Sequence, residues 1–202
     1  METAAVKTVF DGFKRKLIAG DEQAYYETFI ERDGEKQRII LAQQRVMGMT
    51  AASSLATKAI FTFRPQYLIM SGIAAGTGEE SVQMYGDVLV PDMIWDYSTG
   101  KYVGPDEAEI RFGDVGFLPS PISIRTDPEI LDIVNQTKDA ADNEFHVHIG
   151  PLACGSSVVA NSNMVDKQIR SLFPHTIGLD MESIVFILRR TTPVRPSRRH
   201  LW

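Results

Sequence analysis

The sequence contains a single cysteine, Cys154, among its 202 residues. One cysteine excludes a disulfide within the chain, so a reducing compartment is the simplest setting. No apolar run approaches the ~20 residues that a membrane-spanning helix needs, and the N-terminus lacks a signal-peptide pattern. These absences predict a soluble, cytoplasmic protein with no membrane partner.

The chain also has little excess charge of either sign. Its 21 Lys and Arg residues and 26 Asp and Glu residues give a formal net charge of -5, which gives no reason to expect nucleic acid as a partner. Acids are absent after Glu182, whereas arginine and proline are frequent in residues 189–202. We expect this tail to be solvated and disordered, and an acidic partner for it is the alternative.

The remaining composition is that of an ordinary globular protein, with 44% hydrophobic and 23% charged residues. A chain of this length can bury one large core, so one domain is the default expectation. We place that domain at residues 1–188 and the atypical tail at residues 189–202.

Hydrophobic periodicity indicates helices that alternate with strands. Helical spacing predicts helices over Thr3–Leu17, Gly48–Phe63, Asp127–Ala141 and Asn163–Phe173. Strand patterns cover Ala24–Glu31, Lys36–Gln44, Gln66–Ser71, Gly86–Trp95, His146–Ala153 and Ile177–Leu179, and Asp33-Gly34 predicts a hairpin between the first two. Residues Ser98–Ser123 form a long connection, suited to a flap or a subunit contact. Such alternation indicates an α/β sheet covered on both faces.

Two acids follow the last predicted strand. Period-two geometry places Asp180 and Glu182 on one strand face, with Met181 on the other. Paired carboxylates are costly in a core, and ligands collect where the strands of an α/β sheet end, so the pair is a candidate site for a vicinal diol such as a ribose. The alternative, that both acids cap a following helix, has equal weight on these residues alone.

Other candidate functional residues are weaker. Small residues at Gly72–Thr77 and at Cys154–Ser157 let a backbone approach a ligand, but each also suits a simple tight strand exit. His146 and His148 share a strand face without a companion metal ligand, so hydrogen-bonded or surface histidines are favoured. Cys154 lacks a base partner in the sequence, which favours a buried thiol over a nucleophile.

Taken together, these strand exits resemble those of the nucleoside phosphorylase superfamily, and most closely the 5'-methylthioadenosine/S-adenosylhomocysteine nucleosidases and their relatives. Four segments carry the resemblance, in order and spacing: Val46–Met49 with its Ala-rich helix, Tyr67–Gly76, Gly86–Val90, and Phe173–Ser183. The resemblance covers the chain to about Ser183. It implies a three-layer α/β/α sandwich with a mixed, mostly parallel central sheet, a nucleoside substrate, no cofactor, and a homodimer.

The resemblance also implies roles for individual residues. Glu182 would hold the ribose hydroxyls and help to position a water, Glu2 would help to hold that water, and Met181 would pack against the ribose. Further residues would line the nucleoside and base positions: Ile73, Ala74, Ala75, Gly76, Ser156, Ser157, Val158 and Val159. Phosphorylases of the superfamily carry an arginine where this chain has Met70 and Ser71, so water is favoured over phosphate as the nucleophile.

Three departures from the family pattern bear on activity. The family's catalytic aspartate, in a Ser-Asp pair, has no counterpart because no acid follows Glu182. Val158 stands where an aromatic residue stacks on the base, and Met1-Glu2-Thr3 begins after the family's first core strand. We therefore expect a chain truncated at both ends, with a purine nucleoside N-glycosidase function acting on adenosine-type nucleosides such as methylthioadenosine. The alternatives are a nucleoside phosphorylase and a catalytically incomplete nucleoside-binding protein.

Overall fold

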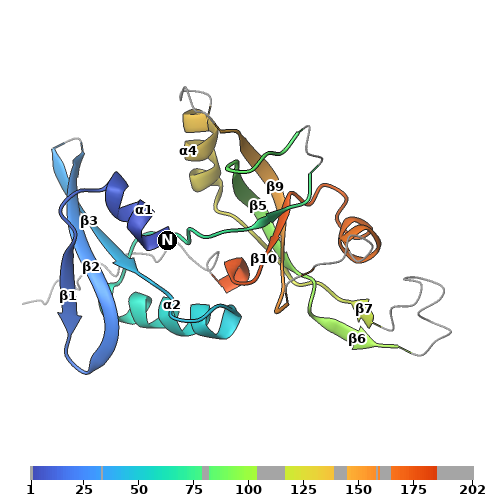
Figure 1. The fold of residues 1–202 in the computed structure, drawn as a ribbon, viewed down its shortest axis with the longest axis horizontal. Helices are drawn as coiled ribbons and strands as arrows, with labels where there is room; N and C mark the ends of the chain where they lie inside the picture. Colours follow the sequence, from blue (N-terminus) through green and yellow to red (C-terminus); the bar gives the residue numbers. More distant parts are fainter. Residues whose placement is uncertain are drawn as a thin grey trace, which may run out of the picture. The chain divides into compact units, whose positions relative to one another are not determined.

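The structure is a computed structural model of the whole chain (Figure 1). It describes residues 2–32, 34–78, 82–103, 117–138, 145–157, 159 and 165–185. The chain divides into two compact units, Met1–Met47 and Gly48–Trp202, and each is described by itself. The domain boundary expected at residues 188 and 189 lies outside the described residues.

The first unit is a helix followed by a three-stranded antiparallel sheet. Helix α1 spans Glu2–Val9, and the strands β1 (Lys14–Ile18), β2 (Asp21–Arg32) and β3 (Glu35–Ala42) follow in the order β1-β2-β3. The predicted hairpin is confirmed, because Arg32 pairs with Glu35 and Gly34 has the positive φ of 78° that such a turn needs.

The single helix predicted over Thr3–Leu17 is wrong in its second half. The helix ends at Val9, and Gly12 turns the chain with a φ of 77° into β1. Strand β1 pairs with β2, and Lys16 Nζ lies 3.4 Å from Glu27 Oε2 across that pair. Pairing with a distant strand thus overrides the local helical spacing.

The second unit contains a five-stranded mixed sheet. Its strands β4 (Ala75–Gly76), β5 (Val88–Asp96), β8 (Ser123–Arg125), β9 (Val147–Cys154) and β10 (Gly178–Asp180) lie in the order β4-β10-β9-β5-β8. The three central strands β10, β9 and β5 are parallel, and both outer pairings are antiparallel. Figure 1 shows β5, β9 and β10 side by side. The predicted α/β class with a mixed sheet is confirmed.

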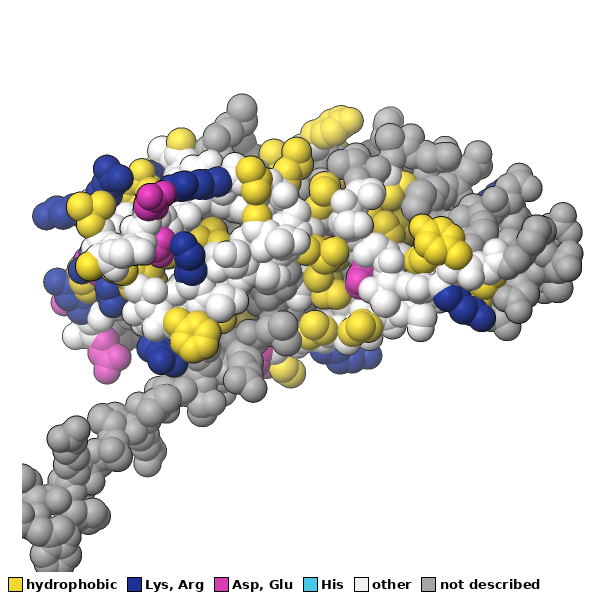
Figure 2. Space-filling model, turned by 90° about the horizontal axis from the view of Figure 1, so that it is seen from below, with side chains coloured by type: hydrophobic (Ala, Val, Ile, Leu, Met, Phe, Trp, Pro, Cys, Tyr) yellow, Lys and Arg dark blue, Asp and Glu magenta, His cyan; other side chains and the backbone are white. Residues whose placement is uncertain are grey.

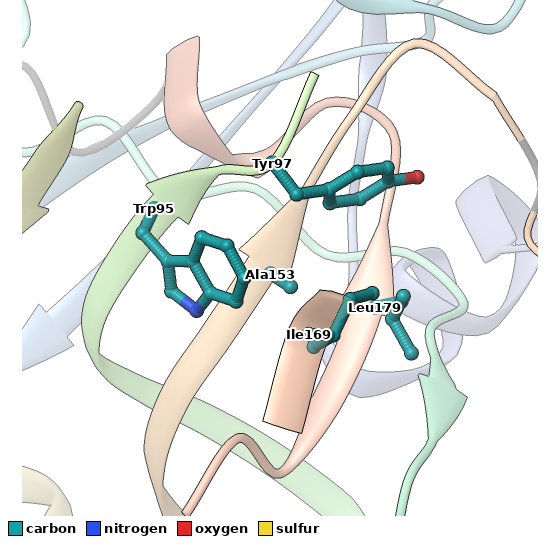
Figure 3. Close-up of a cluster of buried hydrophobic side chains, with 5 residues drawn as sticks. All are labelled: Trp95, Tyr97, Ala153, Ile169 and Leu179. Carbon is teal, nitrogen blue, oxygen red and sulfur yellow. The ribbon is translucent and has the colours of Figure 1, made fainter. Parts of the chain in front are cut away.

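Hydrophobic clusters cover both faces of this sheet. On one face Trp95, Tyr97, Ala153 and Leu179 pack against Ile169 of the π-helix η1 (Val165–Arg170), as Figure 3 shows. On the other face Ile94, Leu152 and Cys154 pack with residues of α2 (Met49–Phe63) and of the 3-10 helix η2 (Ser183–Val185). The alternation of side chains along β5 and β9 produces the two cores.

Strand β5 contains an irregularity in its pairing with β9. The register shifts between Pro91 and Met93, so Asp92 is an extra residue. As a result Leu89 and Ile94, five positions apart, pack in the same cluster. In an uninterrupted strand an odd separation places side chains on opposite faces, so the β-bulge reverses the alternation.

The central strand predicted at Gln66–Ser71 is wrong. Residues 67–74 have no regular secondary structure, and only Ala75–Gly76 join the sheet, as the edge strand β4. Tyr67, Ile69 and Ile73 are 38%, 78% and 80% exposed. Hydrophobic side chains are also exposed on the face of the molecule that Figure 2 shows. An apolar run becomes a strand only with a hydrogen-bonded neighbour, and no described strand pairs with this segment.

The other connections complete the unit. The long segment Ser98–Ser123 contains the two-stranded sheet of β6 (Gly100–Tyr102) and β7 (Phe117–Pro119), and its residues 104–116 lie outside the description. Helix α4 (Pro128–Lys138) begins after Asp127, whose Oδ1 accepts from the Glu129 amide at 2.9 Å as the predicted cap. None of the described helices has the length and apolarity to cross a membrane.

Candidate functional site

The three parallel strands end side by side, and their carboxyl ends form what is called here the carboxyl edge of the sheet. Asp96, Cys154 and Asp180 are the last residues of β5, β9 and β10 and are paired with one another in register. The hydrogen bonds continue one residue further, because Tyr97 N donates to Cys154 O at 3.0 Å and Gly155 N donates to Asp180 O at 3.1 Å. This edge is where α/β sheets bind ligands, so it is the candidate site.

The structure separates the two acids that the sequence treated as a pair. Asp180 is a cap: its Oδ2 accepts from Ser183 N at 2.8 Å and its Oδ1 from Ser183 Oγ at 2.6 Å. Burial raises the pKa of Asp180 above its usual range, while hydrogen bonds from Ser183 and Cys154 act in the opposite direction. The cap interpretation is therefore correct for Asp180, which stabilises the turn into η2.

Glu182 has a different environment. Strand β10 ends at Asp180, so Glu182 belongs to the following turn and the predicted common strand face with Asp180 is wrong. The partly buried Glu182 accepts a hydrogen bond at Oε1 from the backbone amide of Gly48, 2.6 Å away. Gly48 precedes the first residue of α2, so a carboxylate from the sheet edge lies at the start of that helix.

The loop after β9 is held by a tyrosine. Tyr97 Oη donates to the carbonyl oxygen of Ser157 at 2.6 Å. Its ring lies so close to Gly155 that a Cβ added there would be 2.2 Å from Tyr97 Cζ. Ser156 and Ser157 are exposed, Val159 packs against the Trp95 cluster, and Val158 lies outside the described residues. Tyr97 thus fixes the segment predicted to lie along a base.

The small-residue segment Ile73–Gly76, which contains β4, lies beside β10 and also reaches the carboxyl edge. Ala75 pairs with Leu179, and Gly76 pairs with Gly178, which brings them beside the strand that ends at Asp180. Ile73 and Ala74 precede this pairing, with Ile73 80% exposed. A polar side chain fixes the exit of β4, because Gln83 Oε1 accepts from Gly78 N at 2.7 Å and Gln83 Nε2 donates to Ile177 O at 2.9 Å.

Two further predicted residues complete the account. Met181 directly follows β10 and is partly buried. Glu2 begins α1 in the first unit, and only its backbone is described. Within the second unit the structure therefore gathers Ala75, Gly76, Ser156, Met181 and Glu182 on segments that adjoin one sheet edge.

Sequence reasoning missed Gly48, Tyr97 and Asp87. Asp87 accepts from His148 Nε2 at 2.8 Å and from the His146 amide at 2.9 Å, so the hydrogen-bonded interpretation of His148 is confirmed. The amide of Met84, then that of His146 and the His148 ring, hold the pKa of Asp87 well below its usual range. Gly48 had a sequence signal, a glycine directly before an Ala-rich helix, whereas nothing in the sequence marked Asp87 as the partner of His148.

Cys154 is buried, and burial raises the pKa of its thiol to about 12, which agrees with the predicted inert thiol. Across the described ranges no cluster of three or more His, Cys, Asp and Glu side chains could hold a metal ion. The described polar groups where the strands end include the carboxylates of Asp180 and Glu182, the hydroxyl of Ser183 and the amide of Gly48.

Comparisons with known proteins agree with this architecture. The family model described as the phosphorylase superfamily matches residues 14–188. The 5'-methylthioadenosine/S-adenosylhomocysteine nucleosidase of Buchnera aphidicola subsp. Schizaphis graminum is 29% identical over 184 residues, which are 90% of this chain and 70% of that protein. A protein of Sinorhizobium fredii, y4jS, is 26% identical over 185 residues, and the match covers 81% of this chain but only 41% of that protein.

Solved structures give the same fold. The nucleosidase of this type from Neisseria meningitidis, in complex with methylthio-immucillin-A, superposes with a TM-score of 0.68 at 21% identity, covering 93% of this chain and 74% of that one. The Streptococcus pyogenes S-adenosylhomocysteine nucleosidase, bound to 5-methylthiotubericidin, gives 0.67 at 22% identity, covering 92% and 71%. Because the family model spans most of the sequence and the sheet has the expected architecture, the chain belongs to the phosphorylase superfamily.

Proposed function

We propose that this chain binds purine nucleosides at the carboxyl edge of its sheet and hydrolyses the bond between base and ribose. Adenosine-type nucleosides such as methylthioadenosine are the proposed substrates. The observation that carries the proposal is the placement of Glu182, a partly buried carboxylate in the turn where a parallel strand ends. The nucleosidases among the similar proteins support the same class of reaction.

In this proposal Glu182 recognises the ribose and helps to position the attacking water. A carboxylate accepts hydrogen bonds at two oxygens, which suits adjacent hydroxyl groups. Met181 would pack against the sugar, and Ile73 to Gly76 would line the nucleoside. Ser156 to Val159 would lie along the base, with Ser157 held by Tyr97.

Water is preferred to phosphate as the nucleophile for an electrostatic reason. A phosphate dianion needs cationic or multiple amide donors, and the chain has Met70 and Ser71 where the family's phosphorylases have an arginine. Hydrolysis is therefore favoured over phosphorolysis.

A second candidate function is nucleoside binding without turnover. The observation that favours it is that Asp180, the other acid where the parallel strands end, already accepts two hydrogen bonds from Ser183. A general acid that protonates the leaving base contributes about 10²- to 10⁴-fold to the rate, so without one the cleavage would be slow. In either case we propose a cytoplasmic homodimer, for which the molar mass in solution is the direct measurement.

Chromatographic detection of free base tests the proposal. The purified chain is incubated with methylthioadenosine, adenosine and inosine, with and without phosphate, and binding is measured in parallel by calorimetry. Base release that does not depend on phosphate supports the hydrolase, phosphate-dependent release supports a phosphorylase, and binding without release supports the second candidate. Absence of binding to all three nucleosides contradicts the nucleoside site itself.

A pair of charge-matched variants locates the site. Glu182→Gln keeps the length of the side chain but removes its charge, and we expect nucleoside affinity to fall about 10- to 100-fold, as for a lost hydrogen bond to a charged group. Glu129→Gln removes one acid from the exposed surface of α4 and should leave the affinity within about twofold. Equal affinities for the two variants would exclude Glu182 from the site.

A further inference from the structure

The hydrogen bond between Gly48 and Glu182 joins two segments that are 134 residues apart in the sequence. Its distance of 2.6 Å from Gly48 N to Glu182 Oε1 is short, as expected for an amide that donates to a charged acceptor. It joins the start of α2 to the turn after β10, so it fixes the carboxylate against a regular element of the same unit.

The backbone of Gly48 is suited to this contact. Its φ of 109° and ψ of 156° lie in a region that essentially only glycine occupies. A Cβ at this position would meet nothing within 4 Å, so crowding does not require the glycine. The backbone angle alone requires it, and that angle directs the amide toward Glu182.

Helix α2 also lacks a carboxylate of its own at this end. Its first turn contains no acid, and Gly48 provides no side-chain cap. Glu182 occupies the place that a local glutamate takes in a capping box, where a carboxylate accepts from the amide of the N-cap residue. The partial positive charge at the helix N-terminus adds an attraction for Glu182.

We propose that Gly48 is a positioning residue for Glu182. Its amide and the start of α2 hold Oε1, which orients the carboxylate so that Oε2 faces a hydroxyl of the bound ribose. The inference rests on the proposed nucleoside-binding function and adds a specific cause for the affinity of the site. A carboxylate fixed before binding loses less side-chain entropy when the ligand arrives.

The variant Gly48→Ala tests this role, because alanine disfavours the required backbone angle. Gly86→Ala is the matched control: Gly86 lies in the same unit, has a φ of 95°, and also has open space around a Cβ. We expect both variants to lose thermal stability to a similar extent. Only Gly48→Ala should weaken nucleoside binding, by about 10-fold or more.

A double-mutant cycle with Glu182→Gln separates positioning from general damage. If Gly48 acts through Glu182, Gly48→Ala changes affinity much less in the Glu182→Gln background than in the native chain. An equal loss in both backgrounds, or a loss with Gly86→Ala that matches that of Gly48→Ala, would overturn the proposal.

A second measurement avoids any change at Gly48. The amide proton of Gly48 should shift upfield in the NMR spectrum of Glu182→Gln, because the charged acceptor is lost, whereas Glu129→Gln should leave it unmoved. An unmoved Gly48 resonance in both variants overturns the inference even if the chain binds nucleosides. If the resonance shifts but the native chain binds no nucleoside, the proposed function is wrong and the ribose-directed role of Gly48 is overturned with it.

Discussion

Gly155→Ala is a sensitive probe of the loop that follows β9. The added methyl group would lie 2.2 Å from Tyr97 Cζ and 2.5 Å from Cε1 and Cε2, whereas ordinary contacts begin at 3.4 Å. The ring would have to move by about 1 Å or more. Tyr97 cannot do so freely, because it is 6% exposed, donates to the Ser157 carbonyl at 2.6 Å, and meets the edge of Trp95.

Overpacking of this kind costs about 1–3 kcal/mol, and we expect Gly155→Ala to lower the free energy of unfolding by about 2 kcal/mol. For a chain of this size the midpoint of thermal unfolding should fall by about 4–8 °C. Urea unfolding followed by tryptophan fluorescence measures the change. Replacing Trp202 by Phe leaves Trp95, which lies beside Tyr97, as the sole tryptophan.

Two controls make the result specific to the clash with Tyr97. A Cβ at Gly72 meets nothing within 4 Å, so Gly72→Ala should change stability by at most about 0.5 kcal/mol. In a Tyr97→Ala background the ring is gone, and Gly155→Ala should then cost about as little. A full loss of 2 kcal/mol in that background would refute the reasoning.

Three further predictions concern titrating groups. The folded pKa of Asp87 is lowered, so its contribution to stability is present above pH 3.8 and is lost as the pH falls through the folded value. Asp87→Asn should therefore destabilise the chain at pH 7, and the difference in urea midpoint between the native chain and the variant should shrink below pH 4. The folded pKa of Asp180 is raised, so stability is lost as the pH rises from 3.8 through the folded value. Over that rise the free energy of unfolding of the native chain should fall relative to that of Asp180→Asn. A difference between the two chains that stays constant with pH would contradict the raised pKa. The thiol of Cys154, with a pKa of about 12, should react with a disulfide reagent at pH 8 only when urea unfolds the chain.

Elements whose pattern is local were predictable from the sequence. The Asp33-Gly34 hairpin, the Ala-rich helix α2 and the strand β9 follow from turn chemistry and periodicity within a few residues. The strands predicted to end at Trp95 and Ala153 end one residue later, at Asp96 and Cys154.

Features that depend on distant partners were not predictable. Residues Lys14–Ile18 have helical spacing but become a strand because β2 pairs with them. Residues Gln66–Ser71 have a strand's apolar run but no described strand beside them. At the site, Asp180 and Glu182 look equivalent in the sequence, and only the contacts with Ser183 and Gly48 assign one to a cap and the other to a helix start.

The bulge at Asp92 has a consequence for how mutations in β5 should be interpreted. Because of that one extra residue, odd-numbered side chains face one layer before the bulge and the other layer after it. Trp95 and Tyr97 therefore face η1 rather than α2. A substitution at Asp92 would leave this parity intact, whereas deleting the residue would turn the whole C-terminal half of β5 over. Trp95 and Tyr97 would then face the opposite layer. Tyr97, although itself unchanged, would no longer hold Ser157.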